Sequence, residues 1–186
     1  MLEDKRLKES SAIIKRLIAE RGIDKPIEGT VEFFIEKSNQ SIAVASRLLE
    51  LEDEEGLIAE MWIINASYYA MFFAATSLLA RFGHRIKEKS GVHKLTYHAL
   101  THYFLVEDNK LEKHFMEEYK DAVEEAEELL QISERKAEEL IRSFDNEMSK
   151  RKIFTYELGK KAEKKKAKTS LERAKRFVAE IEKIIS

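Results

Sequence analysis

The segment from Met61 to Ala80 constrains the fold more than any other part of the chain, because it contains no charged residue. Its length would suffice to cross a bilayer. Asn65, Ser67 and Thr76 interrupt its hydrophobicity, however, and small residues that would let another helix approach closely recur at helical spacing: Ala66, Ala70 and Ala74. We therefore predict the central helix of a water-soluble bundle, buried on all sides, in a chain that does not span a membrane.

The composition favours long helices over a fold with many tight turns. The 186 residues include six glycines and one proline, and they suffice for one domain with a substantial core. The absence of cysteine excludes disulfide bonds and thiolate metal ligands and points to a reducing compartment. The N-terminal sequence MLEDKRLKES lacks the apolar core of a signal peptide, so we expect a cytoplasmic protein. The content of 37% charged residues, mostly Lys and Glu, is typical of thermophile proteins.

Apolar residues recur at helical spacing along most of the chain, without strand-like alternation. The pattern predicts helices over residues 1–22, 30–53, 57–82, 92–105 and 111–148. Thr30 is expected to cap the second helix, and Gly83 to end the third. The fold class is therefore all-α, an up-and-down helical bundle over residues 30–186, preceded by an N-terminal helix and linker over residues 1–29.

The C-terminal third of the chain is harder to interpret. An unbroken helix over residues 111–148 would be longer than a compact bundle needs, so it either projects as an antiparallel arm or breaks near Ser133. A lysine-rich stretch at 160–168 has a low-complexity composition. The last helix is then expected to begin at Thr169 or Ser170.

Charge is strongly segregated although the net charge is only -2. Residues 107–147 are predominantly acidic, and residues 150–176 are predominantly basic. This segregation suggests either two faces that pair across a dimer or a basic site for an anion. Two solvated helix faces of opposite sign are an equally good explanation.

Two groups of polar residues are candidates for a functional site. Arg151 lies five residues before Tyr156, and its planar guanidinium would suit a phosphate. The alternative is an ordinary surface arginine beside a packed tyrosine. Asn65 lies within the uncharged segment beside Tyr68 and Tyr69, and a buried amide needs a partner. That partner is either Arg151 or Tyr156, or a backbone carbonyl that fixes the register of the helix.

The loop before the fourth helix is a third candidate. Lys87, Lys89, His93 and Lys94, together with backbone N–H groups at the start of the helix, could bind a phosphate. A solvated loop with a capping histidine is the alternative. His98 and His102 lie one helical turn apart, but with neither a third ligand nor a cysteine we interpret them as core or interface histidines and predict no metal site. Nothing in the sequence indicates a cofactor.

Three segments together resemble the HEPN family of small helical bundles, which includes RNA-cutting toxins and their non-cutting relatives. They are NASYYAMFFAATSLLA at 65–80, KEKSGVH at 87–93 and the Arg-x4-Tyr pair at 151–156. The resemblance covers roughly residues 40–185 and leaves the N-terminal helix unexplained. It implies a bundle that dimerises through its central helices, and it places the candidate site at Asn65, at the loop residues Lys87, Lys89, His93 and Lys94, and at Lys150 and Arg151.

The family's ribonucleases pair an arginine with a histidine, and this chain has Tyr156 in that position. It resembles a prokaryotic subgroup with Arg-x4-Tyr. A phenol is a poor general base at neutral pH, so the sequence favours a non-cutting role for Arg151 and Tyr156. The resemblance further implies that the protein binds RNA or a nucleotide and acts with a minimal nucleotidyltransferase in a toxin–antitoxin-like pair. Two alternatives remain, a weak metal-independent endoribonuclease and a non-catalytic helical adaptor.

Overall fold

The computed structural model describes residues 4–55, 58–87, 91–107, 111–126, 128 and 157–186. Within these residues the protein is an all-α helical bundle, as predicted. The helices are α1 (Asp4–Ala19), α2 (Thr30–Glu55), α3 (Glu60–Arg81), α4 (Val92–Leu100), the π-helix η1 (Thr101–Glu107), the helical residues 113–126 and α6 (Glu157–Ile185). Strands β1 (Ile23–Asp24) and β2 (Arg85–Ile86) form a short antiparallel ribbon that the sequence pattern did not predict.

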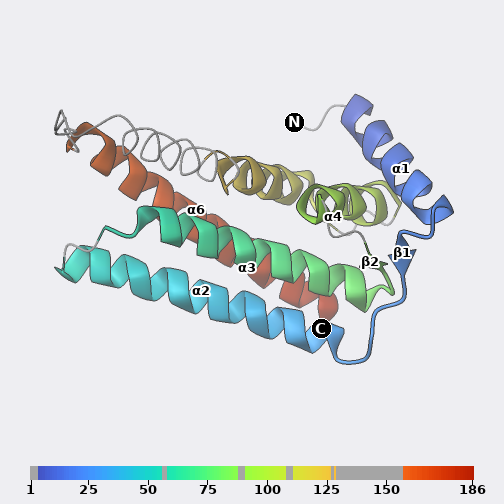
Figure 1. Cartoon of the computed structure of the whole chain (residues 1–186), viewed down its shortest axis with the longest axis horizontal. Helices are drawn as coiled ribbons and strands as arrows, with labels where there is room; N and C mark the ends of the chain where they lie inside the picture. The colour runs from blue at the N-terminus through green and yellow to red at the C-terminus, as the bar shows by residue number, and fades with distance from the viewer. Residues whose placement is uncertain (1–3, 56–57, 88–90, 108–110, 127, 129–156) are drawn as a thin grey trace, which may run out of the picture.

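The bundle has α3 at its centre. Helices α2 and α6 pack along α3 and against each other, whereas α4 packs on another side of α3 (Figure 1). Helix α1 lies across α4 and η1 at one end of the molecule. The predicted N-terminal helix is thus part of the packed structure.

Small and hydroxyl side chains allow α2 and α3 to approach closely. Ala70 and Ala74 are fully buried. The hydroxyl of Ser38 on α2 donates to the carbonyl of Ala70 at 2.8 Å, and Ser77 on α3 donates to the carbonyl of Val31 at 2.9 Å. The predicted contact of another helix with the small-residue positions of α3 is therefore confirmed at Ala70.

Helix α3 is long and apolar enough to cross a membrane, but 67% of its apolar 18-residue stretch is buried inside the bundle. This burial is consistent with the core helix of a soluble protein. The prediction that α3 is buried on all sides is wrong near its N-terminus, where Trp62 is 62% exposed and Tyr69 is 43% exposed. The uncharged segment therefore contributes to the surface as well as to the core.

One predicted helix cap is correct and another is wrong. Gly83 has a φ of 84°, and the N–H groups of Gly83 and His84 donate to carbonyls in the last turn of α3, so this glycine ends the helix as predicted. Thr30, in contrast, donates its hydroxyl to the carbonyl of Ile27. The first turn of α2 is closed by the N–H of Phe33, which donates to the carbonyl of Gly29.

The last helix begins earlier than predicted. Helix α6 starts at Glu157, so the lysine-rich stretch at 160–168 is helical and neither Thr169 nor Ser170 is a cap. The hydroxyl of Thr169 donates to the carbonyl of Lys165 within the helix, and that of Ser170 donates to Glu125. Serine and threonine mid-helix can satisfy their hydroxyls in this way without ending the helix.

Described residues of the acidic and basic segments form ion pairs with each other within one chain. Arg173 of α6 contacts Glu125 at 3.2 Å, and Arg176 contacts Glu118 at 2.8 Å. These ion pairs join α6 to the helix at 113–126. Most of the predicted 111–148 helix, including Ser133, lies outside the described residues, so a projecting arm and a break near Ser133 both stay predictions.

Candidate functional site

A cavity of about 380 Å³ opens beside the N-terminal half of α3. It is bounded by α3, by the first turn of α4 and by the end of the helix at 113–126. Its lining residues are Trp62, Asn65, Tyr68, Tyr69, His93, Val123 and Ala126. On α3, Asn65, Tyr68 and Tyr69 follow Trp62 by three, six and seven positions. This spacing places the four residues on one face of the helix.

The structure brings together two residues that the sequence singled out separately. Asn65 comes from the uncharged segment and His93 from the loop and start of the fourth helix, and both line this cavity. His93 is in the first turn of α4, two residues after Gly91, whose φ of 69° allows the chain to turn into the helix. One residue from each of these two predicted groups therefore lines the same cavity.

Tyr68 and His93 form the polar centre of the cavity wall. The Tyr68 hydroxyl is hydrogen-bonded to Nδ1 of His93, and the side chain of Tyr68 is almost fully buried. The ring of Phe72 lies 4.3 Å from that of His93, between centroids, and so helps to fix the imidazole. When the phenol donates to Nδ1, the imidazole proton sits on Nε2. This contact assigns Tyr68 a polar role beyond the packing role that an aromatic residue in a core helix suggests.

The open side of the cavity is aromatic. Trp62 and Tyr69 lie on either side of Asn65 in sequence, and both are substantially exposed. Tyr69 contacts the ring of Tyr68 at 5.4 Å and that of His93 at 6.0 Å. Exposed aromatic rings beside an amide and an imidazole can stack on a planar polar ligand.

Tyr119 adds a buried phenol near this wall. Its side chain is fully buried, and its hydroxyl has no hydrogen-bond partner among the described residues. Burial, and to a lesser extent the nearby Tyr68, raise the pKa of Tyr119 well above its usual value of 10.0. Tyr119 precedes Val123 by one helical turn, on the face that reaches the cavity. Sequence reasoning treated Tyr119 only as an apolar position.

Sequence reasoning also missed Trp62. The available signal was its spacing, since it is the only tryptophan in the chain and lies three residues before Asn65. Of the remaining predicted residues, Lys87 and Lys94 are exposed and do not line the cavity. Lys89, Lys150, Arg151 and Tyr156 lie outside the described residues, so their position relative to Asn65 stays a prediction.

The two histidines at metal-like spacing bind serines of α1 instead. Nδ1 of His98 is hydrogen-bonded to the hydroxyl of Ser10 at 3.0 Å, and Nδ1 of His102 to that of Ser11 at 3.2 Å. Among the described residues, no group of three or more His, Asp or Glu side chains is arranged to hold a metal ion. These histidines attach α1 to the bundle.

Comparison with known proteins finds no family model and no curated protein that matches the chain. The protein is therefore classified by its own structure, as an all-α bundle with an aromatic-lined cavity beside the N-terminal half of its central helix α3.

Proposed function

We propose that the chain is a homodimeric, cytoplasmic HEPN-like protein that binds a nucleotide, free or within RNA, in the cavity beside α3. The observation that carries this proposal is that Asn65 and His93 line one cavity together with two exposed aromatic residues, Trp62 and Tyr69. An amide presents a donor and an acceptor to the edge of a nucleobase, and an imidazole presents one or the other. Every base also has a face that can stack on an aromatic ring.

The size and surroundings of the cavity support the same ligand. A volume of about 380 Å³ falls in the range of small-molecule sites, roughly 300–1,000 Å³. The first turn of α4 carries His93 and Lys94, and Gly91 before it offers no side-chain cap for the helix N–H groups. Such a turn favours an anion, so a phosphate attached to the bound base would find a complementary charge there.

Exposed aromatic residues on α2 and α3 support homodimerisation. Phe33 on α2 is 53% exposed, and its ring contacts lead through Phe34 and Phe73 to Tyr69. Exposed apolar side chains that adjoin one another in this way are typical of protein–protein interfaces. In the proposed dimer this surface would place a second copy close to the cavity.

The single tryptophan provides the first test. Trp62 lines the cavity, so titration with nucleoside monophosphates and short oligoribonucleotides should quench its fluorescence. Loss of the amide hydrogen bonds in Asn65→Ala should weaken binding by about 1–3 kcal/mol, or roughly 5- to 150-fold. Asn39→Ala, which removes an exposed amide on α2, should leave binding unchanged. An unchanged fluorescence at millimolar nucleotide, or equal effects of the two variants, would refute the proposal.

Incubation of labelled RNA in a chelator separates binding from cutting. We expect the wild type to bind RNA without cleaving it, and Arg151→Ala to bind more weakly because a guanidinium has been removed. Cleavage by the wild type that is lost in Arg151→Ala would make the protein a metal-independent endoribonuclease. Unchanged binding by Arg151→Ala would assign Arg151 a structural role.

The proposed partner is a minimal nucleotidyltransferase in a toxin–antitoxin-like pair. This part of the proposal rests on the resemblance at 65–80 and 87–93. The genes next to the one that encodes this chain provide a direct check. A small nucleotidyltransferase encoded there should co-purify with the protein, and the lack of such a neighbour would favour the adaptor hypothesis.

A further inference from the structure

A second and larger depression lies at the opposite end of the α4–η1 segment from His93. It has a volume of about 650 Å³, and its walls are α1, η1 and the start of the helix at 113–126. We call it the α1 groove; its lining residues include Leu7, Lys8, Ala12, Lys15, Leu105 and Lys113. Helix α1, which forms one wall of the groove, lies outside residues 40–185, where the resemblance to the HEPN family was found, and has no role assigned above.

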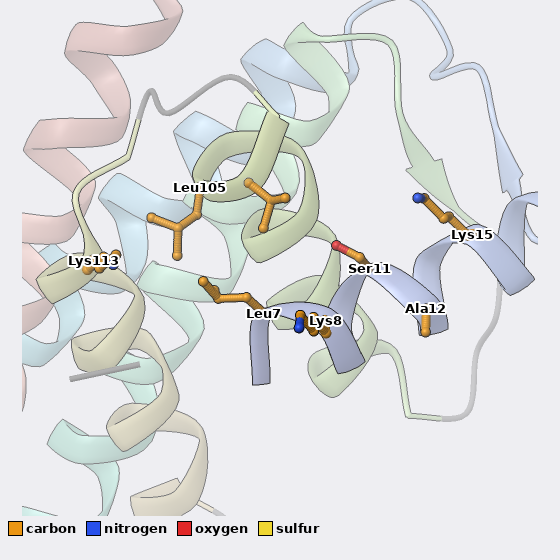
Figure 2. Close-up of a pocket in the computed structure, with 8 residues that line it drawn as sticks. Leu7, Lys8, Ser11, Ala12, Lys15, Leu105 and Lys113 are labelled. Carbon is orange, nitrogen blue, oxygen red and sulfur yellow. The ribbon is translucent and has the colours of Figure 1, made fainter. Parts of the chain in front are cut away.

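The floor of the groove is aliphatic. Leu7 on α1 and Leu105 on η1 point toward each other across it (Figure 2). Ala12 and Val106 extend this surface, and Val106 is 45% exposed. None of the described residues that line the groove is aromatic, so these residues offer no surface on which a nucleobase could stack. This absence argues against a nucleic acid as the ligand.

The rim of the groove is positively charged. Lys8, Lys15 and Lys113 are exposed, and none of them forms an ion pair with another described residue. Among the part of the chain that the structure describes, no acidic residue lines the groove. On α1, Glu20 instead pairs with Arg16. The ligand that complements this surface is apolar along its centre and acidic at its sides.

The spacing of the lysines matches a helix. Lys8 and Lys15 are seven residues apart, which is two helical turns or about 10.5 Å along α1. A second helix lying along α1 presents carboxylates seven residues apart at the same interval, with apolar residues between them. The groove is more open than enclosed, whereas sites for small molecules enclose most of their ligand.

The groove is also held in place before any ligand binds. Ile14 and Leu17 anchor α1 in the core, and the hydrogen bonds of Ser10 and Ser11 to the histidines of α4 and η1 fix its position. Leu105 lies on the π-helix η1, a conformation that is rare and is often found at functional sites. A preformed groove costs a partner less ordering entropy on binding.

We propose that the α1 groove binds an acidic amphipathic helix of a partner protein. The apolar face of the partner helix would pack between Leu7 and Leu105. Its carboxylates would pair with Lys8, Lys15 and Lys113. The inference does not depend on the nucleotide site, because no residue lines both cavities. Failure of one proposal therefore leaves the other intact.

The test uses a fluorescent helical peptide of about 20 residues, a length at which a helix can form in water. Leucines form one stripe, and glutamates flank it at seven-residue intervals. The controls are a scrambled peptide of the same composition and one with lysine in place of glutamate. Fluorescence anisotropy should report binding of the acidic amphipathic peptide alone, and this binding should weaken as salt is added.

Matched variants locate the binding surface. Lys8→Ala and Lys15→Ala should each weaken binding by about two- to fivefold, the usual effect of an exposed ion pair. Lys25→Ala removes an exposed lysine outside the groove and should have no effect. Ala12→Trp should abolish binding by filling the groove, whereas Ala43→Trp, at an exposed position on α2, should not. Circular dichroism checks that each variant is folded.

Several results would overturn the proposal. The first two are absence of peptide binding and equal binding of the scrambled peptide. Displacement of the peptide by an oligoribonucleotide or by a fatty acid would assign the groove to that ligand instead. If light scattering finds that the wild type is an oligomer and that Ala12→Trp has a smaller mass, the groove is a contact between copies of this chain.

Discussion

Replacing Ile14 by alanine tests whether α1 is an integral part of the fold. The Ile14 side chain is fully buried and belongs to the same core cluster as residues of α3 and α6. The substitution removes three carbons, each worth about 0.8 kcal/mol of hydrophobic transfer free energy. The cavity left behind adds to this cost, so we expect the free energy of unfolding to fall by about 2–5 kcal/mol.

Ile18 provides a matched control on the same helix. It lies one turn after Ile14 and is 46% exposed, so Ile18→Ala should lower the free energy of unfolding by less than about 1 kcal/mol. For a chain of this length, 1 kcal/mol shifts the melting temperature by roughly 2–4 °C. Calorimetry should therefore find Ile14→Ala about 4–20 °C below the wild type, in a single cooperative transition.

Two results would refute this reasoning. Equal shifts for Ile14→Ala and Ile18→Ala would mean that α1 does not bury Ile14 in solution. A separate low-temperature transition in Ile14→Ala would mean that α1 detaches without unfolding the bundle. In either case the walls of the α1 groove would not be preformed.

Two further changes probe buried polar groups. Tyr119→Phe removes a buried hydroxyl that has no partner among the described residues, so it should raise the free energy of unfolding by about 1 kcal/mol in denaturant titrations; a decrease would reveal a partner. Burial lowers the pKa of His98 below its usual 6.5, against the opposing effect of Glu9. The unfolded chain then binds this proton more readily, so the contribution of His98 to stability is complete above about pH 6.5 and is lost as the pH falls through the lowered pKa. Melting temperatures of His98→Gln should depend less on pH over that range.

Local patterns predicted the helices well. Apolar spacing located α2, α3 and the start of α4, and Gly83 was recognised as a helix end because few other residues accept a positive φ. These features depend on neighbours within one or two turns. The apolar spacing of a helix is visible in the sequence whatever the helix packs against, so these helices could be predicted.

Features that depend on distant residues were not predictable in the same way. Ser170 looks like a helix cap until its hydroxyl is seen to donate to Glu125, 45 residues earlier in the chain. The ribbon of β1 and β2 is two residues long on each side, too short for an alternating pattern, and it exists because Ile23 meets Ile86. The π-helix at 101–107 likewise has no sequence signal that distinguishes it from an ordinary helical turn.

The candidate site was predictable in its parts but not in its assembly. Asn65 stood out because an amide in an apolar helix needs a partner, and His93 because it follows a basic loop. Their position in one cavity depends on how α4 packs on α3, which no local pattern encodes. Trp62 was overlooked for a related reason, since an aromatic residue in an uncharged helix is expected to be buried.

The uncharged segment extends beyond the buried part of α3, because it includes the exposed residues Trp62 and Tyr69. Core burial alone would account for the absence of charge near Ala70 and Ala74, but not at residues that face solvent. A charged side chain costs nothing at an exposed position, so two large aromatic rings there are best explained by a surface that becomes covered. A bound base would cover Trp62 beside Asn65, and a second copy would cover Phe33 and the rings that lead to Tyr69. If the protein forms the proposed dimer, nucleotide binding that is lost on its dissociation would show that one aromatic surface serves both contacts.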